Sequence, residues 1–188
     1  NSVIATKAAL KMSEYVVTEA GFGADLGFEK FIDIKCRKSG LAPDCVVVVA
    51  TIRALKMHGG VAKDALGSEN VEAVEKGFAN LAEHVKNIRK FALPLVIAVN
   101  RFSADSNAEV SKLMTLAADL GVECIETDHW ARGGAGAEDL AHAVVGVIES
   151  TPSQLKLLYD DDLPLWEKVR TVAREIYGAD DIIGEQKV

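Results

Sequence analysis

The sequence predicts an α/β fold with a mainly parallel, doubly wound sheet. Two observations lead to this prediction: strand-like and helix-like segments alternate along the chain, and two of the strand-like segments, residues 45–52 and 94–100, are almost continuously apolar. A continuous apolar run suits a strand that is covered on both faces of a parallel sheet. Successive strand–helix units build an open sheet with helices on its faces. Ligands of such folds bind at the carboxyl ends of the strands.

The first part of the chain predicts one short strand between two helices. Residues 2–13 have a helical pattern, and either of the first two residues can cap the helix. Residues 15–20 are rich in β-branched side chains, which favours a strand. A glycine-rich turn at 21–27 leads into a predicted helix at 28–38, where apolar residues recur at helical spacing.

The middle and last parts of the chain continue the alternation. The strand at 45–52 is followed by a predicted long polar loop through residues 56–60. Residues 70–91 predict a long amphipathic helix, because apolar residues recur every three or four positions. The remaining predicted elements are a strand at 94–100, a helix at 106–120 that Gly121 ends, a strand at 123–127, and helices at 138–149 and 164–177.

Length and composition narrow the class of protein. A chain of 188 residues suits one sizeable core, so we predict a single α/β domain over 1–178 and a linker or the start of another region at 179–188. Both ends of the sequence look cut, which suggests a piece of a longer protein. The net charge of −7 and the lack of a basic stripe argue against nucleic acid as a partner. No apolar run is long enough for a membrane helix.

The three cysteines indicate a reducing compartment, most simply the cytoplasm. Their number is odd and no C-x-x-C pair occurs, so neither structural disulfides nor a zinc site is predicted. The pattern also offers no Ser/His/Asp or Cys/His nucleophile, and the acidic run at 160–162 reads as a solvated loop. The sequence therefore assigns no catalytic residue and no protein-held metal.

Four loops are expected at the carboxyl edge of the sheet, and the first two could meet an anion. In the loop 18–27, glycines let backbone N–H groups approach an anion closely, and Glu19 or Asp25 could hold a metal or a proton. A tight turn that needs glycine explains this loop equally well. In the second loop, Arg53, Lys56 and His58 precede a glycine pair, which suggests an anion cradle. A solvated basic loop is the alternative.

The third and fourth loops could hold flat rings. The amide of Asn100 supplies both a donor and an acceptor to a purine edge, and Phe102 could stack on a ring. A turn cap and an ordinary core residue are the alternatives for these two. In the loop 128–136, Trp130 lies among glycines with few neighbours to pack on, so a flat aromatic ligand could supply the missing contact. The alternative is a tryptophan folded back on the sheet edge.

Longer motifs then make the chain resemble a known family. The segments V-V-T-E-A-G-F-G-A-D-L-G at 16–27 and V-A-T-I-R-A-L-K-M-H-G-G at 49–60 look like formate–tetrahydrofolate ligase, and residues 157–159 and 175–179 also fit. The resemblance runs over essentially the whole chain. It implies a P-loop NTPase-like fold, here incomplete, and a cytoplasmic homo-oligomer that works on small-molecule substrates.

The resemblance implies a reaction and a set of binding residues. The family joins formate to tetrahydrofolate with ATP and Mg²⁺, through formyl phosphate, and gives 10-formyltetrahydrofolate, ADP and phosphate. Phe102 and Trp130 would clamp the pterin of the folate. The expected nucleotide- and formyl-phosphate-binding residues are Glu19, Gly21, Phe22, Gly23, Lys56, His58, Gly59, Gly60 and Asn100.

One departure from the family pattern limits the expected activity. The family holds the ATP phosphates on a G-x-G-K-T-T type loop upstream of the matching region, and this sequence does not contain it. Phosphoryl transfer needs the Lys and Mg²⁺ of such a loop, so we expect no ligase turnover from this chain alone. Two alternatives stay open: a non-catalytic folate- or partner-binding module of the same fold, and an unrelated scaffold whose loops contact a protein partner.

Overall fold

The structure, a computed structural model, describes residues 2–184 and groups them into two compact units. Residues Pro43–Gln154 form one unit, which holds the sheet. Residues 2–42 and 155–184 form the other. The single α/β domain predicted over 1–178 therefore spans both units. Residues 185–188, which belong to the predicted linker, lie outside the described residues.

The sheet has three parallel strands in the order β1-β2-β3. They are β1 (Val46–Ala50), β2 (Leu95–Asn100) and β3 (Cys124–Thr127). The register places Asn100 beside Thr127, so β2 and β3 end at the same level. The three strands predicted in this part of the chain and their parallel arrangement are confirmed.

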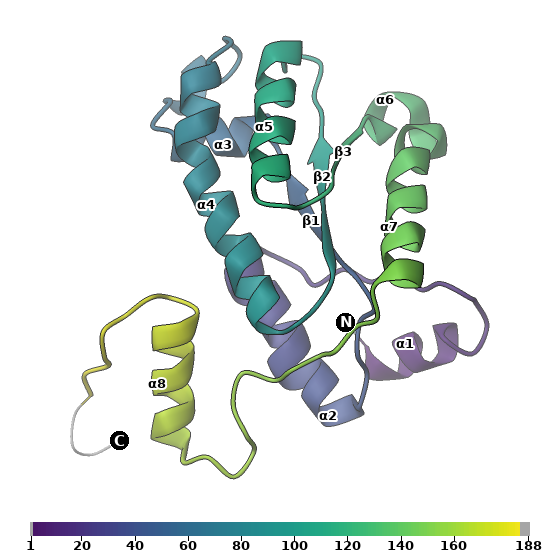
Figure 1. Cartoon of the computed structure of the whole chain (residues 1–188), viewed down its shortest axis with the longest axis vertical. Helices are drawn as coiled ribbons and strands as arrows, with labels where there is room; N and C mark the ends of the chain where they lie inside the picture. Colours follow the sequence, from purple (N-terminus) through teal and green to yellow (C-terminus); the bar gives the residue numbers. More distant parts are fainter. Residues whose placement is uncertain (1, 185–188) are drawn as a thin grey trace. The chain divides into compact units, whose positions relative to one another are not determined.

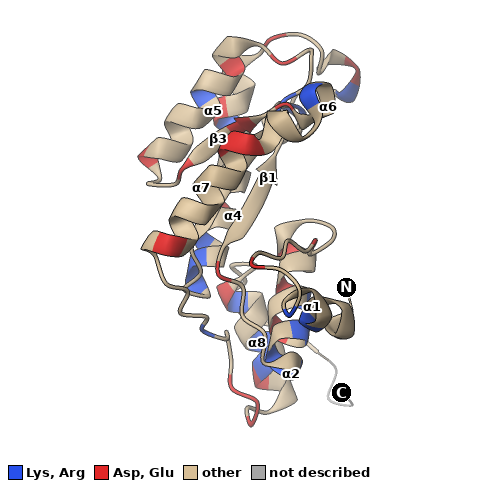
Figure 2. Cartoon of the chain, turned by 90° about the vertical axis from the view of Figure 1, so that its right-hand side faces the viewer, with Lys and Arg blue, Asp and Glu red and all other residues tan. Residues whose placement is uncertain are grey.

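Helices cover both faces of this sheet. The helices of the unit are α3 (Ile52–His58), α4 (Val71–Lys90), α5 (Asn107–Asp119), α6 (His129–Arg132) and α7 (Glu138–Ser150), with short 3₁₀ turns at Lys63–Ala65 and Gly133–Ala137. Helices α4 and α5 lie on one side and α7 on the other (Figures 1 and 2). The doubly wound α/β arrangement is confirmed.

Helix α4 provides most of the apolar cover on its side of the sheet. Its cap is Asn70, whose side chain accepts the Ala73 N–H at 2.9 Å. Its buried face recurs at helical spacing, as the sequence predicted, and comprises Ala73, Val74, Gly77, Phe78, Leu81, Val85 and Ile88. Removing this face from water stabilises the unit through the hydrophobic effect.

Two glycines let α3 and α4 cross at close range. A Cβ atom on Gly77 of α4 would lie 1.8 Å from the carbonyl oxygen of Leu55 in α3. A Cβ on Gly59 would lie 2.1 Å from the carbonyl oxygen of Ala73. Neither backbone oxygen can give way as a flexible side chain would, so the crossing requires glycine at both positions.

Strand β1 is less covered than its sequence predicts. The central residues of β2, from Val96 to Val99, are buried, whereas Val49 of β1 is 64% exposed and Val47 is exposed as well. Helix α7 packs against β3 and β2, which explains why the face of β1 on that side stays open. The expectation that 45–52 is covered on both faces is therefore wrong for β1.

The polar loop predicted after β1 is also wrong, because most of it is helix α3. Thr51 caps the helix by accepting the Ala54 N–H at 3.1 Å. Ile52 and Leu55 bury one face of it. The basic residues that suggested a loop are interspersed with this apolar face.

The second unit is mainly helical. It contains α1 (Val3–Ala9), two π-helical segments (Ala24–Phe28 and Lys30–Cys36), α2 (Arg37–Ser39) and α8 (Leu165–Glu175). The helices predicted at 2–13, 28–38 and 164–177 are thus confirmed in position, with π-type hydrogen bonding in the second. The strand predicted at 15–20 is wrong: these residues are not assigned to a strand, and Val17 is exposed. A strand needs a neighbour to pair with, and β-propensity alone does not supply one.

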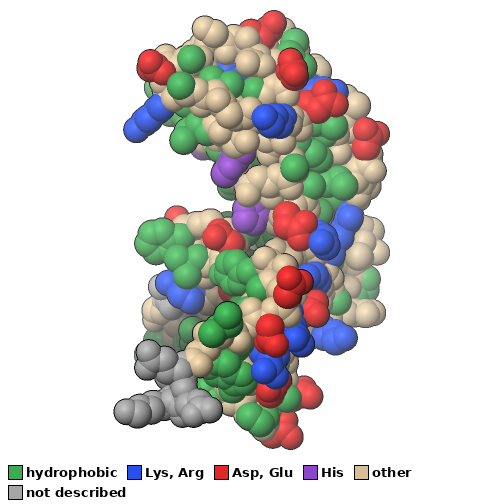
Figure 3. Space-filling model, turned by 90° about the vertical axis from the view of Figure 1, so that its left-hand side faces the viewer, with side chains coloured by type: hydrophobic (Ala, Val, Ile, Leu, Met, Phe, Trp, Pro, Cys, Tyr) green, Lys and Arg blue, Asp and Glu red, His purple; other side chains and the backbone are tan. Residues whose placement is uncertain are grey.

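On the face drawn in Figure 3, acidic and basic side chains are interspersed rather than gathered into a basic stripe. Within residues 2–184, no helix combines the length and apolar character that crossing a membrane requires.

Candidate ligand-binding site

Three of the four predicted loops begin at one end of the three-stranded sheet. Helix α3 starts two residues after β1, and the loops with Phe102 and Trp130 follow β2 and β3. Because Asn100 and Thr127 are register partners, Phe102 lies two residues beyond one strand end and Trp130 three residues beyond its neighbour. Neither ring lies in a core: Phe102 is half-buried and Trp130 is 77% exposed.

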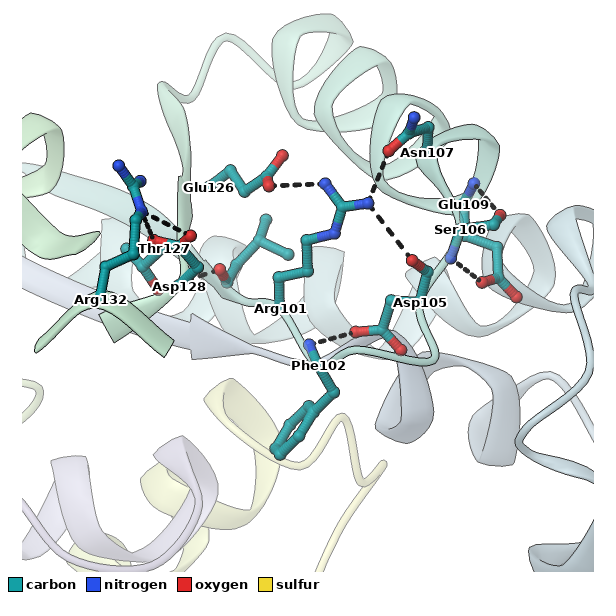
Figure 4. Close-up of polar contacts among 11 residues, drawn as sticks. Arg101, Phe102, Asp105, Ser106, Asn107, Glu109, Glu126, Thr127, Asp128 and Arg132 are labelled. Atoms are coloured by element: carbon teal, nitrogen blue, oxygen red, sulfur yellow. Dashed lines mark hydrogen bonds and ion pairs between the residues drawn. The ribbon is translucent and has the colours of Figure 1, made fainter. Parts of the chain in front are cut away.

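A tight turn fixes the backbone that carries Phe102. The Phe102 N–H donates to Asp105 Oδ2 at 2.8 Å, and the Asp105 N–H donates to the Phe102 carbonyl at 3.0 Å (Figure 4). Ser106 then caps α5 in a capping box with Glu109. The turn and the cap together hold the aromatic ring at the exit of β2.

Arg101 ties this loop to β3 and to α5. Its backbone N–H donates to the Thr127 carbonyl at 3.0 Å, which extends the sheet ladder by one step. Its guanidinium donates to Glu126 Oε1 at 2.7 Å and to Asn107 Oδ1 at 2.5 Å (Figure 4). The charge of Arg101 is therefore compensated within the site.

A second arginine lies against the ring of Phe102. The guanidinium carbon of Arg53 is 4.9 Å from the ring centroid, a cation–π distance. Arg53 comes from the first turn of α3, so this contact connects the ends of β1 and β2. Among the described residues, no carboxylate forms an ion pair with Arg53.

Trp130 lies on the one-turn helix α6, not in an open glycine loop. Asp128 anchors the turn: its N–H donates to the Gly136 carbonyl at 3.1 Å, and its carboxylate accepts Arg132 Nε at 2.7 and 2.8 Å. The Arg132 hydrogen bond holds the pKa of Asp128 below its ordinary value. The exposure of Trp130 argues against a ring folded back on the sheet edge.

Lys56, a predicted anion ligand, is fully buried in an ion pair. Its Nζ lies 2.8 Å from Glu109 Oε1, and both side chains are 0% exposed. Nζ also donates to the Ser68 carbonyl at 3.1 Å. In this structure Lys56 is therefore not available to a ligand, because its ammonium is already compensated inside the unit.

Glu109 is the centre of that buried network. Oε1 also accepts the Asn70 N–H at 2.8 Å, and Oε2 accepts the Ser106 N–H at 3.0 Å. Burial raises the pKa of Glu109, but the hydrogen bonds from Lys56, Ser106 and Asn70 outweigh it and hold the pKa below its ordinary value. One carboxylate thus joins the starts of α4 and α5 to the end of α3.

The other predicted residues of this segment are at the end of α3. His58 is exposed in the last turn. Gly60 has a φ of +94°, which favours glycine. Together with the close approach of Gly59 to α4, this gives the glycine pair a structural explanation. His58 and Gly60 are exposed, whereas Gly59 is half-buried.

Asn100 carries an oxygen that the fold leaves without a partner. Its Oδ1 is buried and has no hydrogen-bond partner among the described residues. Buried acceptors are normally paired, so an unpaired one at a strand end is a position where a ligand's N–H can be expected. This geometry fits the predicted use of the Asn100 amide.

The glycine-rich loop belongs to the other unit, and its backbone is unusual. Gly21 has a φ of +69° and Phe22 one of 56°, which is rare for a bulky side chain. A Cβ on Gly27 would lie 1.4 Å from the Gly21 carbonyl oxygen, so the turn closes on itself. Phe22, Gly23 and Glu19 are exposed around it. Strained backbone of this kind often marks a ligand site.

A carboxyl group near this loop was not predicted from the sequence. Burial raises the pKa of Glu29 to about 7, with Asp33 and Asp25 adding to the increase. Glu29 Oε1 is buried without a hydrogen-bond partner in the described chain. Glu29 can therefore exchange a proton near neutral pH.

The thiols and the metal-ligand types do not form a site of their own. All three cysteines are free, as predicted, and burial raises the pKa of Cys36 to about 11 and that of Cys124 to about 12. Thiols with such pKa values stay protonated and unreactive. Within residues 2–184, no three His, Cys, Asp or Glu groups are arranged to hold a metal ion.

Comparison with known proteins decides the family. The model of the family described as formate–tetrahydrofolate ligase matches residues 1–188. The chain belongs to the formate–tetrahydrofolate ligase family. Proteins named formate–tetrahydrofolate ligase from Granulibacter bethesdensis, Methylobacterium nodulans and Pelagibacter ubique are 65%, 59% and 56% identical to it over its whole length.

The ligase-family chain spans about a third of the length of these curated relatives. It covers 33% of the Granulibacter protein and 34% of the other two. The resemblance stated from the sequence motifs is confirmed. The residues that the sequence did not single out for this site are Arg101, Asp105 and Glu109. Locally, Asp105 and Glu109 indicate only a turn and a helix cap, and the ion pairs of Glu109 with Lys56 and of Arg101 with Glu126 join distant segments.

Proposed function

We propose that this chain forms the folate-binding edge of an ATP-dependent ligase that joins formate to tetrahydrofolate. Formate oxygen attacks the γ-phosphorus of ATP, which gives formyl phosphate and ADP. N10 of tetrahydrofolate then attacks the formyl carbon, releases phosphate and loses a proton, which leaves 10-formyltetrahydrofolate. Family membership supports this reaction class.

The observation that carries the proposal is the placement of two aromatic rings after neighbouring strands. Phe102 and Trp130 follow strand ends that are register partners, and neither ring is used in a core. A pterin is flat and can stack between two rings, with each aromatic contact contributing about 0.5–1.5 kcal/mol. Arg53 occupies one face of Phe102, so the pterin would take the other face.

We assign the remaining predicted residues to the phosphate and base of the nucleotide and to formyl phosphate. The backbone of Gly21, Phe22 and Gly23 would serve the anionic groups, as the positive φ angles of Gly21 and Phe22 suggest, and Glu19 would hold a metal or a proton beside them. His58 and Gly60 would contribute from the end of α3. Lys56 would act through Glu109 rather than touch a ligand, and Gly59 would act by keeping α3 close to α4.

Asn100 is proposed to read the adenine base. Its unpartnered Oδ1 can accept an N–H, and its amide can donate in return. Mg²⁺ would enter with the nucleotide, because this ion is held largely by phosphate oxygens and water with few protein carboxylates. Its chemistry there would be to neutralise charge on the phosphates.

The wider setting of the enzyme is part of the proposal. We propose a P-loop NTPase-like fold for the whole protein, a cytoplasmic location and a homo-oligomeric assembly. The odd number of cysteines and the lack of a C-x-x-C pair support a reducing compartment. The absence of the G-x-G-K-T-T loop from this sequence supports the expectation that these 188 residues alone do not turn over.

Binding of tetrahydrofolate to a Trp130 variant tests the clamp. In the full-length protein, Trp130→Ala should weaken tetrahydrofolate binding by about fivefold or more, since about 1 kcal/mol of stacking is lost. The control is Trp166→Phe, the other tryptophan of this chain, which lies on α8. Tryptophan emission should respond to tetrahydrofolate in the wild type and the control, but much less in Trp130→Ala. Equal affinity in all three proteins would remove the basis of the proposal.

Turnover separates the ligase from a non-catalytic folate-binding module. A ligase in its full-length form makes 10-formyltetrahydrofolate only when ATP, formate and tetrahydrofolate are all present. A binding module would bind tetrahydrofolate and give no product under these conditions. Assay of the full-length protein, with the 188-residue chain in parallel, distinguishes the two functions.

A further inference from the structure

The loop that carries Phe102 contains a buried carboxylate that is only half used. Asp105 is 5% exposed, and its Oδ2 accepts the Phe102 N–H at 2.8 Å. Its other oxygen, Oδ1, is buried and has no hydrogen-bond partner in residues 2–184. The neighbouring Arg101 donates to the backbone carbonyl of Asp105, not to its carboxylate. Its shorter hydrogen bonds go to Glu126 and Asn107. A buried acceptor is thus left without a partner in the loop that carries the aromatic ring.

The turn itself does not require this second oxygen. Asparagine has the same length as aspartate and offers one carbonyl oxygen, which is all that the Phe102 N–H needs. A carboxylate at this position adds a second oxygen, Oδ1, which is buried and accepts no hydrogen bond from the described residues. The extra oxygen therefore needs another explanation.

Two buried acceptor oxygens without a hydrogen-bond partner among the described residues lie before and after Phe102 in the sequence. Asn100 Oδ1 at the end of β2 is the first, and Asp105 Oδ1 is the second. A ligand that satisfies Asp105 Oδ1 must bring an N–H donor to the loop that carries Phe102. The 2-amino-4-oxo edge of a pterin has this chemistry, because a ring N–H stands next to an amino group on a flat heterocycle.

We propose that Asp105 is a specificity-determining residue whose unpartnered oxygen accepts an N–H from the 2-amino group of the pterin of tetrahydrofolate. This inference rests on the proposed function, since it uses Phe102 as the stacking ring. The amino group of adenine offers similar donor chemistry. The pterin is preferred because Asp105 hydrogen-bonds directly to the residue that stacks on it.

Replacing one oxygen by an amide tests this assignment in the full-length protein. In Asp105→Asn the amide oxygen stays on the Phe102 N–H, and the amide nitrogen takes the place of Oδ1, so a donor would face the donors of the ligand. Tetrahydrofolate should bind at least tenfold more weakly by calorimetry, while ATP affinity and the melting temperature change little. Asp119→Asn, an exposed residue of α5, makes the same charge change and should leave both affinities intact.

A change in the ligand gives a second test that needs no variant. A tetrahydrofolate with its 2-amino group replaced by methyl should bind the wild type at least tenfold more weakly. It should bind Asp105→Asn with less than a twofold further loss, because the same contact is already gone. Equal binding of the two folates to the wild type would overturn the proposal even if Asp105→Asn failed to fold.

The outcomes also separate this inference from the function beneath it. Normal tetrahydrofolate binding by Asp105→Asn would overturn the role of Asp105 and leave the folate clamp in place. Weaker ATP binding with normal tetrahydrofolate binding would transfer the contact to adenine and also overturn the proposal. A wild-type protein that binds no tetrahydrofolate would overturn the proposed function and this inference together.

Discussion

Removing Lys56 should destabilise the sheet-containing unit more than any single surface charge. Lys56→Met keeps the length and apolar stem of the side chain but leaves Glu109 charged and fully buried. Breaking a buried ion pair by removing one partner costs about 3–5 kcal/mol. Glu109 keeps two backbone donors, from Asn70 and Ser106, so we expect the lower end of this range.

Removing Glu109 should lower the free energy of unfolding more than removing Lys56. Glu109→Ala strands the Lys56 ammonium and also removes the acceptor of two part-buried N–H groups, those of Asn70 and Ser106, each hydrogen bond contributing about 0.5–1.5 kcal/mol. The free energy of unfolding from urea titration should therefore fall in the order wild type, Lys56→Met, Glu109→Ala. The double variant Lys56→Met, Glu109→Gln should recover part of the loss, since no buried charge remains.

A surface pair provides the control, and pH provides a further test. Lys86 and Glu83 form an exposed pair at 2.9 Å, so Lys86→Met should change stability by less than about 1 kcal/mol. The folded-state pKa of Glu109 is lowered, so its contribution is present above the unfolded-state pKa and is lost as pH falls through the folded one. A loss below about 1 kcal/mol for Lys56→Met at pH 7 would refute the reasoning.

Three other perturbations have expected outcomes. Arg53→Ala removes the cation from the clamp ring and should weaken tetrahydrofolate binding about two- to fivefold by calorimetry, given about 0.5–1 kcal/mol for an exposed cation–π contact; an unchanged affinity would show that the ring is held without it. Gly77→Ala places a Cβ 1.8 Å from the Leu55 carbonyl oxygen and should lower the melting temperature, whereas Gly146→Ala in α7 meets nothing within 4 Å and should leave it equal or higher; similar effects of the two would contradict the close crossing. Glu29 keeps its proton in the folded state up to about pH 7, but in the unfolded state it loses the proton near its ordinary pKa of 4.5. The free energy of unfolding should therefore fall as pH rises from about 4.5 to 7. Relative to wild type, Glu29→Gln should raise the melting temperature at about pH 8 but not at about pH 4.5.

The sheet could be predicted because its signals are local. The apolar runs that became β1 and β2 and the spacing along α4 each lie within one segment. The segment 15–20 has the composition of a strand, but pairing depends on a neighbour that composition does not reveal. The polarity of Lys56 suggested a loop because its partner, Glu109, is 53 positions away in the sequence.

The site could be predicted in part for the same reason. The rule that ligands bind where parallel strands end directed attention to Asn100, Phe102 and Trp130 from strand positions alone. It did not find Asp105, because an aspartate in a turn usually only shapes the turn. Asp105 is distinguished only by the structure, in which Oδ2 accepts a hydrogen bond and Oδ1 has no partner among the described residues.

The uncovered valines of β1 have a practical consequence for handling the protein. Among the described residues β1 pairs with β2 on one side only, so it is an edge of the three-stranded sheet, and the exposed Val47 and Val49 lie on its open face. An apolar edge strand is a template on which another chain can add. Preparations of these 188 residues should therefore self-associate as their concentration rises, and a lysine at position 49 should keep them dispersed.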